Sequence, residues 1–240
     1  MPSEEFKVTD GKRTPVFAYI LIAGPGGSGK TYSALLLAKG LGGKVVVVDS
    51  ESKPVSVYGD EFTFKVVKVE KPFTPERFRS AIRAAMEQKP SVLIVDTVTH
   101  EWMGSGGILS EMNKFQEANP RAPQFLYWKD ATPKHDRFVE ALTSQKCHVI
   151  ACARGREKFV VERVKDDQGR LKNVPKSIGT RPLQRKDFRY DFMLAFILDP
   201  ETHNARVLTN VTKWGRNWEA RPLTEKDGRD IATWARGPKK

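Results

Sequence analysis

Residues 24–31 read GPGGSGKT, a full match to the phosphate-binding pattern G-x-x-x-x-G-K-[ST]. The apolar run at 16–23 before it predicts a buried strand, and residues 30–41 after it predict a helix. Glycines allow backbone angles that turn N–H groups towards phosphate oxygens, and the following helix directs the positive end of its dipole at the same charge. The stretch therefore predicts a nucleotide site between a strand and a helix.

The pattern gives individual residues of this stretch a role. Lys30 is expected to reach the β- and γ-phosphates, and the Thr31 hydroxyl is expected to hold Mg²⁺. The alternative is a glycine-rich turn without a ligand. The predicted nucleotide-binding residues are Gly24, Pro25, Gly26, Gly27, Ser28, Gly29, Lys30, Thr31 and Tyr32.

Strand-like and helix-like stretches alternate through the first 150 residues. Residues 74–88 predict an amphipathic helix, because Thr74 is a natural cap and Pro75 suits the first helical position. This alternation predicts a parallel sheet with right-handed crossovers. The further core strands are predicted at residues 44–49, 62–69, 91–96 and 147–153.

Two more helices are predicted before the last core strand. One covers residues 108–118, and the other covers 132–145 with Thr132 as its cap and Pro133 at its first position. After residue 153 the pattern changes to a basic β-hairpin with a turn at 166–169 and irregular chain to residue 187. The remaining predicted elements are hairpin arms at 156–164 and 170–174, an antiparallel pair at 190–198 and 205–212, and a helix at 223–236.

These elements together predict an α/β fold. Its central sheet is mostly parallel and flanked by helices, with antiparallel closing strands and a basic hairpin inserted at about residues 155–189. We expect one domain over residues 16–240 after a flexible leader of residues 1–15.

Two acidic residues at strand ends complete the predicted site. Asp96 ends the strand at 91–96, where a carboxylate would hold Mg²⁺ together with Thr31. The next residue is Thr97, so no glutamate stands beside Asp96 to orient the attacking water. Glu51, after the strand at 44–49, is therefore the candidate general base, beside the phosphate loop if the two strands are neighbours. The alternative for Glu51 is a solvated loop acid.

The charge of the chain favours a polyanionic partner. The formal net charge is +12 and the isoelectric point is near 9.7. Residues 154–189 hold twelve cationic and five acidic side chains, a net charge of +7, which suits phosphate contacts unless the hairpin is only a solvated charged face. The predicted nucleic-acid contacts are Arg156, Lys158, Arg163, Lys165, Arg170, Lys172, Lys176, Arg181, Arg185 and Lys186.

The apolar runs, the cysteines and the aromatic residues give further expectations about location and contacts. No apolar run reaches the length of a membrane span and the N-terminus lacks a secretory signal, so we expect a cytosolic protein without a membrane partner. Cys147 and Cys152 are predicted to face opposite sides of one strand, where they cannot form a disulfide. Trp102, Phe125, Tyr127 and Trp128 are candidates for base stacking or, more commonly, for packing, which is also expected of Trp214 and Trp218.

The acids and the later stretches together resemble a known family. Asp49-Ser50-Glu51 and Val95-Asp96-Thr97-Val98 are similar to the RecA-type recombinase core. Residues 148–154, 182–185 and 190–192, with Trp128 and His135, resemble phage-encoded ATPases with a RecA-like core, some of which anneal single-stranded DNA. The resemblance covers about residues 16–220.

The resemblance implies roles for several positions. Glu51 falls where that core activates water, and Asp96 where it binds Mg²⁺. Arg154 falls where the core has a γ-phosphate sensor, usually an amide, so the arginine is a departure. Lys213 and Arg216 fall where a basic residue reaches the ATP of the neighbouring subunit. The resemblance thus implies ATP and Mg²⁺ as cofactors and a ring or filament with ATP at subunit interfaces.

The leading hypothesis is a weak or DNA-stimulated ATPase that binds single-stranded DNA and promotes annealing or recombination in phage DNA metabolism, in the host cytoplasm. A single-strand-binding protein is a further candidate partner. Two alternatives stay open from the sequence. A nucleotide kinase would use the basic hairpin as a lid over two substrates, and an ATP-driven loader would act on a partner protein.

Overall fold

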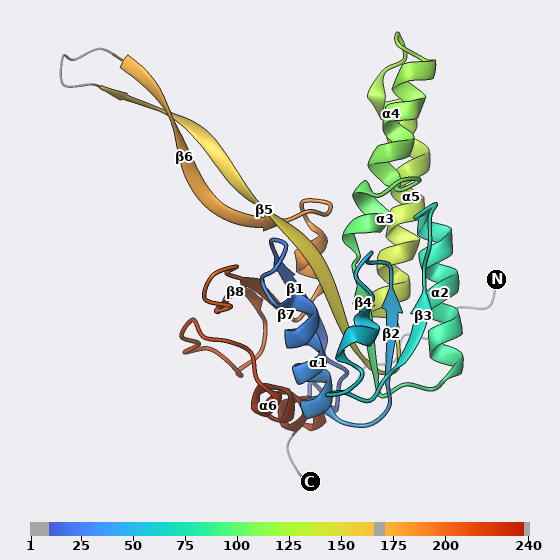
Figure 1. Ribbon diagram of the computed structural model, residues 1–240, viewed down its shortest axis with the longest axis vertical. Helices are drawn as coiled ribbons and strands as arrows, with labels where there is room; N and C mark the ends of the chain where they lie inside the picture. Colours follow the sequence, from blue (N-terminus) through green and yellow to red (C-terminus); the bar gives the residue numbers. More distant parts are fainter. Residues whose placement is uncertain (1–9, 166–170, 238–240) are drawn as a thin grey trace.

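The computed structural model describes residues 10–165 and 171–237, and its centre is a single sheet of eight strands within that part of the chain (Figure 1). Their order is β3-β2-β4-β5-β1-β7-β8, and β6 pairs with an extension of β5. Neighbours from β3 to β7 are parallel, whereas β7–β8 and β5–β6 are antiparallel. The strands are β1 (Tyr19–Gly24), β2 (Val45–Asp49), β3 (Lys65–Lys68), β4 (Val92–Asp96), β5 (His148–Lys165), β6 (Leu171–Pro182), β7 (Leu194–Leu198) and β8 (Ala205–Asn210).

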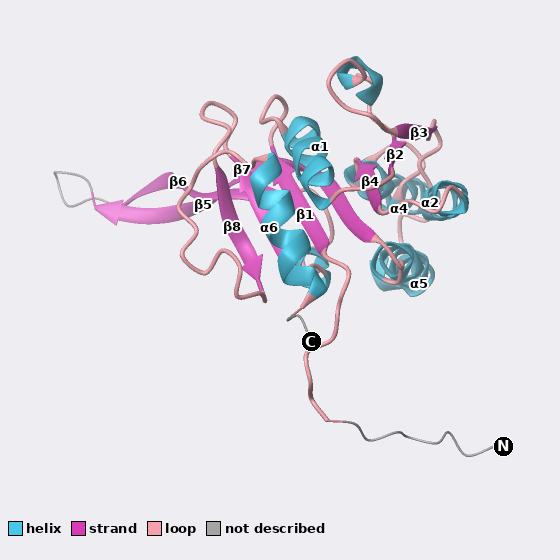
Figure 2. Cartoon of the chain, turned by 90° about the horizontal axis from the view of Figure 1, so that it is seen from below, coloured by secondary structure: helices cyan, strands magenta, loops and turns pink. Residues whose placement is uncertain are grey.

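Helices cover both faces of this sheet, and α1 and α6 lie side by side across β1 (Figure 2). Ile20 and Ile22 of β1 pack in a cluster with residues of α1 and α6, whereas Leu21 and Ala23 face a cluster that includes α2 and α5. Successive residues of a strand point to opposite faces, so a strand covered on both faces is a continuous apolar run. The helices are α1 (Lys30–Leu41), α2 (Pro75–Glu87), α3 (Thr99–Met103), α4 (Ile108–Ala118), α5 (Gln124–Thr143) and α6 (Glu225–Arg236), with short 3₁₀ helices η1 (Val55–Tyr58) and η2 (Phe188–Asp191).

Local sequence signals set the ends of several helices. The Thr74 side chain accepts a hydrogen bond from the Arg77 backbone N–H at the start of α2. Thr224 and Asp227 form a reciprocal capping box at the start of α6. Among the described residues, no helix is both long and apolar enough to cross a membrane.

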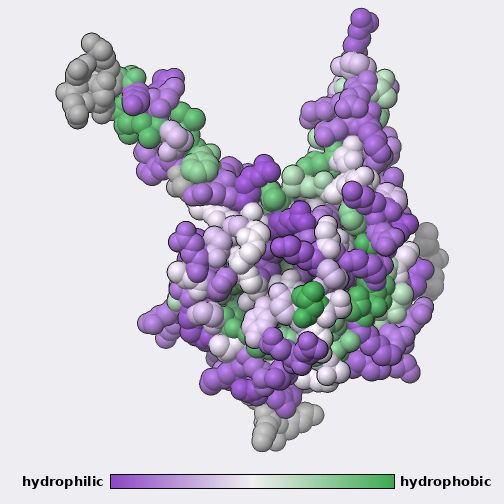
Figure 3. Space-filling model, in the orientation of Figure 1, coloured by the Kyte–Doolittle hydropathy of each residue, from purple (hydrophilic) through white to green (hydrophobic). Residues whose placement is uncertain are grey.

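Two arms project from the same end of the molecule. One is the β5–β6 hairpin and the other contains α4 and the first half of α5 (Figure 1). Figure 3 shows open space between the two arms. Strand β5 begins in the core between β1 and β4 and continues without interruption into the hairpin. The hairpin arm is thus an extension of the central sheet.

The predicted α/β class is confirmed, with corrections in four places. Helix α5 begins at Gln124, so the prediction that it begins at Thr132 is wrong and Pro133 lies inside the helix. Contacts of the earlier turns with neighbouring elements, such as the Tyr127 ring against Phe115 of α4, extend the helix beyond its local signal.

The other corrections concern strands and a short helix. Strand β6 continues to Pro182, well past the predicted end at residue 174, and as an edge strand it accommodates its prolines. Helix α3 was not predicted. Strands β4 and β5 separate β2 from β1, so these two are not neighbours.

Part of the predicted leader is attached to the domain. Residues 1–9 and the predicted hairpin turn at 166–169 lie outside the described residues. Arg13 lies 5.1 Å over the Trp234 ring and donates to the carbonyl of the same residue. The Val16 backbone N–H donates to the Ala235 carbonyl at 2.9 Å. These contacts join the start of the described chain to α6.

Candidate nucleotide site

The phosphate loop connects the end of β1 to the start of α1, as the sequence predicts. Gly27 and Gly29 have a φ of +80°, a backbone angle that residues other than glycine rarely adopt. A Cβ on Gly24 would lie 2.4 Å from the Ser28 Oγ and 2.9 Å from the Leu198 carbonyl. Backbone angles and close packing therefore both require glycine in this loop.

Lys30 is held inside the loop. Its Nζ donates to the Pro25 carbonyl at 2.8 Å, and the residue is only 9% exposed. Burial lowers the pKa of Lys30, while the nearby carboxylates of Asp96 and Glu51 act in the opposite direction. Burial removes water from the Lys30 ammonium, so a phosphate bound in the loop would stabilise its charged form.

Thr31 and Asp96 lie together, as predicted from their motifs. The Thr31 Oγ1 donates to the Asp96 Oδ2 at 2.5 Å. Asp96 is 2% exposed, and its Oδ1 has no hydrogen-bond partner among the described residues. Burial raises the pKa of Asp96 to about 6, although the Thr31 hydrogen bond favours the charged form. A divalent cation beside Asp96 would satisfy Oδ1 and offset the desolvation of its charge, so these two residues fit a Mg²⁺ site.

Glu51 and Arg154 form a two-point ion pair. The Arg154 Nε donates to the Glu51 Oε1 at 3.0 Å, and the Nη2 donates to the Oε2 at 2.5 Å. Burial alone would raise the pKa of Glu51, but the hydrogen bonds and charge of Arg154 hold it below its ordinary value. Arg154 pairs in register with Gly24 across β5 and β1, which puts it at the phosphate loop. Glu51 reaches the site although β2 is not beside β1.

A network of polar residues behind Asp96 was not predicted. The Thr97 backbone N–H donates to the Ser50 Oγ at 3.0 Å, and the Arg154 backbone N–H donates to the Thr99 Oγ1 at 2.8 Å. His100 places its Nδ1 3.0 Å from the same Ser50 hydroxyl. Burial lowers the pKa of His100, while Glu51 acts in the opposite direction. The threonines that follow Asp96 in the sequence could have indicated a polar network. The hydrogen-bond partners of these threonines depend on the order of the strands, which the sequence does not specify.

His203 also lies at the loop and was missed by sequence reasoning. A Cβ added to Gly29 would lie 3.5 Å from the His203 Nδ1. The β7–β8 turn that carries His203 is fixed by the Asp199 side chain, which accepts hydrogen bonds from Glu201 and Thr202. Tyr32, predicted to bind nucleotide, instead contacts the ring of Tyr58 in η1, and its hydroxyl donates to Glu61, shortly after η1, at 3.0 Å. Its nucleotide contact stays a prediction.

Lys213 and Arg216 lie away from the phosphate loop of their own chain. Strand β8 runs antiparallel to β7, and its last residue, Asn210, pairs with Leu194 at the start of β7. The phosphate loop lies at the opposite end, where β7 finishes. Both cations are exposed beside a hollow of about 450 Å³ that Trp214 also lines. Neither belongs to the cluster formed by Lys30, Asp96 and Glu51.

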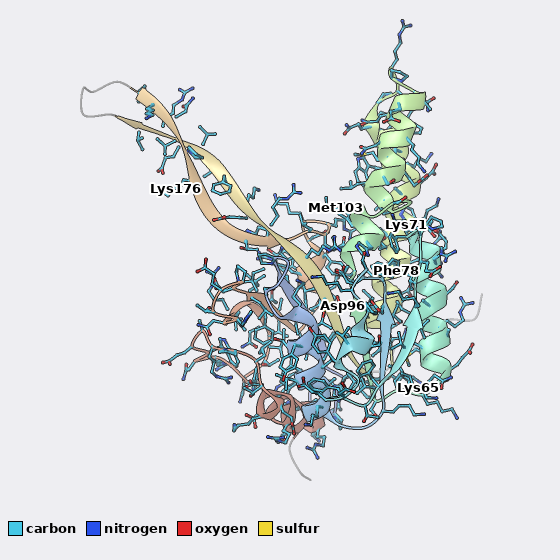
Figure 4. The ribbon with its side chains drawn as sticks, viewed as in Figure 1. Lys65, Lys71, Phe78, Asp96, Met103 and Lys176 are labelled. Carbon is cyan, nitrogen blue, oxygen red and sulfur yellow. The ribbon has the colours of Figure 1, made fainter. Side chains whose placement is uncertain are left out.

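The predicted nucleic-acid contacts follow the hairpin arm and its base. In Figure 4, Lys176 lies partway along the hairpin arm and Asp96 lies in the body of the protein. Lys176 pairs with Glu162 at 2.9 Å. Arg185 pairs with Asp136 at 2.5 Å and with Asp187 at 2.7 Å, so its charge is balanced locally. Arg170 lies outside the described residues, and DNA contact by this set stays a prediction. Among the predicted nucleic-acid contacts that the structure describes, the exposed residues are Arg156, Lys158, Arg163, Lys172, Lys176, Arg181 and Lys186.

The tryptophans near the helical arm are packed together. The Trp102 and Trp128 rings stack at 5.9 Å, and Trp102 meets the edge of His135 at 5.0 Å. Tyr127 donates its hydroxyl hydrogen to the Ile108 carbonyl. Phe125 is the exception among the four predicted stacking candidates, with 65% of its surface exposed.

Comparison with known proteins adds a family match. A family model described as an AAA domain matches residues 17–180, which include the phosphate loop, Glu51, Asp96 and Arg154. No curated protein matches the sequence. A solved structure described as the crystal structure of the RadB recombinase is similar over 90% of this chain and 92% of that chain, with 16% sequence identity and a TM-score of 0.40.

Proposed function

The chain belongs to the AAA domain family, and from this premise we propose that it is a Mg²⁺-dependent, RecA-like ATPase that binds single-stranded DNA and promotes annealing or recombination. The observation that carries the proposal is the convergence of Lys30, Asp96 and the Glu51–Arg154 pair on one phosphate loop. This is the set of groups that phosphoryl transfer to water requires.

Each residue has a defined part in hydrolysis. Backbone N–H groups of the loop and the Lys30 ammonium bind the phosphates. Thr31 and Asp96 would hold Mg²⁺, which would supply positive charge to the phosphates. Glu51 orients the water and takes its proton as it attacks the γ-phosphate. Binding and positioning of charge therefore account for most of the expected catalysis.

Arg154 limits the action of Glu51. A carboxylate held at two points by a guanidinium cannot also accept the proton of a water in good geometry. The γ-phosphate is a competing anion for Arg154, which lies at the phosphate loop. We expect ATP to draw Arg154 from Glu51 to the γ-phosphate and so to release the general base.

The basic hairpin supports the nucleic-acid part of the proposal. Its described cations are exposed on an arm that projects away from the phosphate loop (Figure 4). A lid of a nucleotide kinase would have to bring such cations over the phosphates, whereas a projecting arm suits a long polyanion. The binding is expected to be sensitive to salt and largely blind to sequence.

Two measurements on the intact protein test the proposal. Retention of a single-stranded oligonucleotide on a filter across a salt series, with ATP and Mg²⁺, should fall steeply as salt rises. Phosphate release from ATP should require Mg²⁺ and increase when the oligonucleotide is added. Absence of retention at low salt would refute the DNA part. Rapid formation of diphosphates from ATP and nucleoside monophosphates without DNA would support a kinase instead.

A further inference from the structure

Tyr190 is an exposed aromatic residue on a firmly anchored segment. It belongs to the 3₁₀ helix η2, which follows the hairpin strand β6, and 66% of its surface is exposed. Phe188 and Phe192, two positions to either side, are 1% and 2% exposed, with their rings 5.1 Å apart. These two buried rings fix the backbone of the segment while the ring of Tyr190 stays outside the core.

Within the described chain, one cation contacts this ring, and two more act on its phenol by their charge. The Arg189 Cζ lies 4.7 Å from the ring centroid, and the Arg189 Nη2 donates to the Tyr190 hydroxyl oxygen at 2.7 Å. That hydrogen bond and the charge of Arg189 lower the pKa of the Tyr190 phenol, with further contributions from Arg181 and Lys186. The phenol therefore lies in a field of positive charge.

The acidic residues of the same segment face other partners. Asp187 pairs with Arg185, which also binds Asp136 of α5. The titratable groups around Asp191 are Arg185, Asp187, His135 and Asp136. In contrast, Arg181, Lys186 and Arg189 make no ion pair within the described part of the chain. The acidic side chains of the segment thus lie near Arg185 and α5, whereas the cations near Tyr190 have no acidic partner in the described part of the chain.

An open aromatic ring among unpaired cations is the arrangement that proteins use for single-stranded nucleic acids. Bases of a single strand have free faces that stack on an aromatic ring, and cations beside the ring bind the flanking phosphates. Free phosphate would use the cations but would gain nothing from the ring. A duplex would present phosphates with its base faces already stacked.

We propose that Tyr190 is a nucleobase-stacking platform for single-stranded DNA, with Arg181, Lys186 and Arg189 bound to the phosphates on either side of the stacked base. The proposal rests on the single-stranded DNA binding proposed above and adds its base-contacting residue. The platform lies at the root of the hairpin, where the Leu183 backbone N–H donates to the Arg154 carbonyl at 2.7 Å. A strand bound along the hairpin would therefore reach Tyr190 close to the nucleotide site.

The test compares ordinary and abasic oligonucleotides. A fluorescein-labelled oligothymidylate and a strand of the same length with abasic sites at every internal position are titrated with the intact protein, and anisotropy gives the Kd. We expect the abasic strand to bind wild-type protein about tenfold more weakly, because it keeps its phosphates and loses stacking. This comparison needs no variant and is independent of variant folding.

Matched variants locate the effect. Tyr190→Ala should weaken binding of the ordinary strand about tenfold and abolish the difference between the two strands, whereas Tyr190→Phe should stay within about twofold of wild type. The control is Phe17→Ala, which removes a ring with 42% of its surface exposed from the chain just before β1, at the opposite end of that strand from the phosphate loop, and should leave the Kd unchanged. Lys186→Gln should reduce the slope of log Kd against log salt by about one.

The outcomes separate the two proposals. If wild type binds the ordinary and abasic strands equally and Tyr190→Ala binds like wild type, the platform is refuted while DNA binding stands. An equal loss in Phe17→Ala and Tyr190→Ala would also refute it, because the effect would not belong to this site. If wild type binds neither strand at low salt, both proposals fail.

Discussion

Glu51 and Arg154 come from strands that are not neighbours and still meet in one ion pair. We expect Glu51→Gln to lower the rate of ATP hydrolysis about 10²- to 10⁴-fold, because the amide cannot take a proton from the water. Affinity for ATP should change little, since the loop at residues 24–31 binds the phosphates. Phosphate release and titration with a fluorescent ATP analogue measure the two quantities separately.

A second exposed acid provides the control for this substitution. Glu70→Gln removes one negative charge from the surface near β3 and should leave hydrolysis unchanged. If Glu51→Gln keeps more than about a tenth of the wild-type rate, Glu51 is not the general base and another group must orient the water.

His148 should make the stability of the protein depend on pH. Its Nδ1 accepts a hydrogen bond from the Ala18 backbone N–H at 3.0 Å, and burial lowers its pKa below the ordinary histidine value. The unfolded chain then binds more protons at this residue than the folded chain as the medium becomes acidic. The stability that the neutral imidazole provides is therefore complete above the ordinary histidine pKa and is lost as pH falls through the folded-state value.

Denaturant unfolding at pH 8 and pH 5 tests this prediction. His148→Asn keeps a hydrogen-bond acceptor for Ala18 and cannot be protonated in this range. We expect the free energy of unfolding of the wild type to fall more between the two pH values than that of the variant. Parallel changes in the two proteins would show that His148 does not contribute.

At the scale of elements, the capping box makes the start of α6 a local source of stability. The Thr224 Oγ1 accepts from the Asp227 backbone N–H, and the Asp227 carboxylate accepts from the Thr224 backbone N–H at 2.8 Å. Thr224→Ala should cost about 1 kcal/mol of unfolding free energy. Thr233→Ala is the control, because that hydroxyl lies inside the same helix, where it donates to the Arg229 carbonyl and accepts from the Arg236 side chain, and it caps no helix end. Equal effects of the two substitutions in denaturant titrations would contradict a capping role.

Elements with strong local signals were predicted well from the sequence. The bounds of α1 were predicted at its actual ends, and Thr74 was correctly predicted to cap α2. Helix α5 shows the limit of this reasoning. Pro133 is typical of a first turn, but tertiary contacts of the preceding residues keep the helix intact through it.

The candidate site likewise contains residues that local motifs predict and residues whose arrangement depends on the tertiary structure. The phosphate loop and Asp96 could be predicted because each is a short motif on one strand end. The Glu51–Arg154 pair joins residues 103 positions apart, and its geometry depends on an order of strands that no local pattern specifies. Tyr190 is recognisable only in the structure, because its exposure depends on the burial of Phe188 and Phe192.

At the scale of the whole molecule, the position of Lys213 and Arg216 bears on assembly. Both lie at the end of the sheet opposite their own phosphate loop, so a catalytic role requires a neighbouring subunit. A chain with Glu51→Gln and a chain with Lys213→Ala and Arg216→Ala should each be inactive alone. Mixed in equal amounts, they should recover about a quarter of the wild-type ATPase rate, because about a quarter of random interfaces join the two intact halves.

The mixing order provides the control for this experiment. Chains assembled separately with ATP and DNA and combined only before the assay should stay inactive, since exchange is then slow relative to the measurement. Activity of the Lys213/Arg216 variant alone, or absence of recovery in the premixed sample, would contradict completion of the site by a neighbour.

The unbroken course of β5 has a mechanical consequence. From Gly155 to Lys165 the strand extends for about 33 Å beyond the sheet, at roughly 3.3 Å per residue. A rotation of about 10° at Arg154 would then carry the tip of this lever through about 6 Å if the hairpin moves as a rigid body. If the Arg154 guanidinium moves from Glu51 to the γ-phosphate, as proposed above, a small change at the nucleotide site would produce a displacement of several ångströms at the tip of the hairpin.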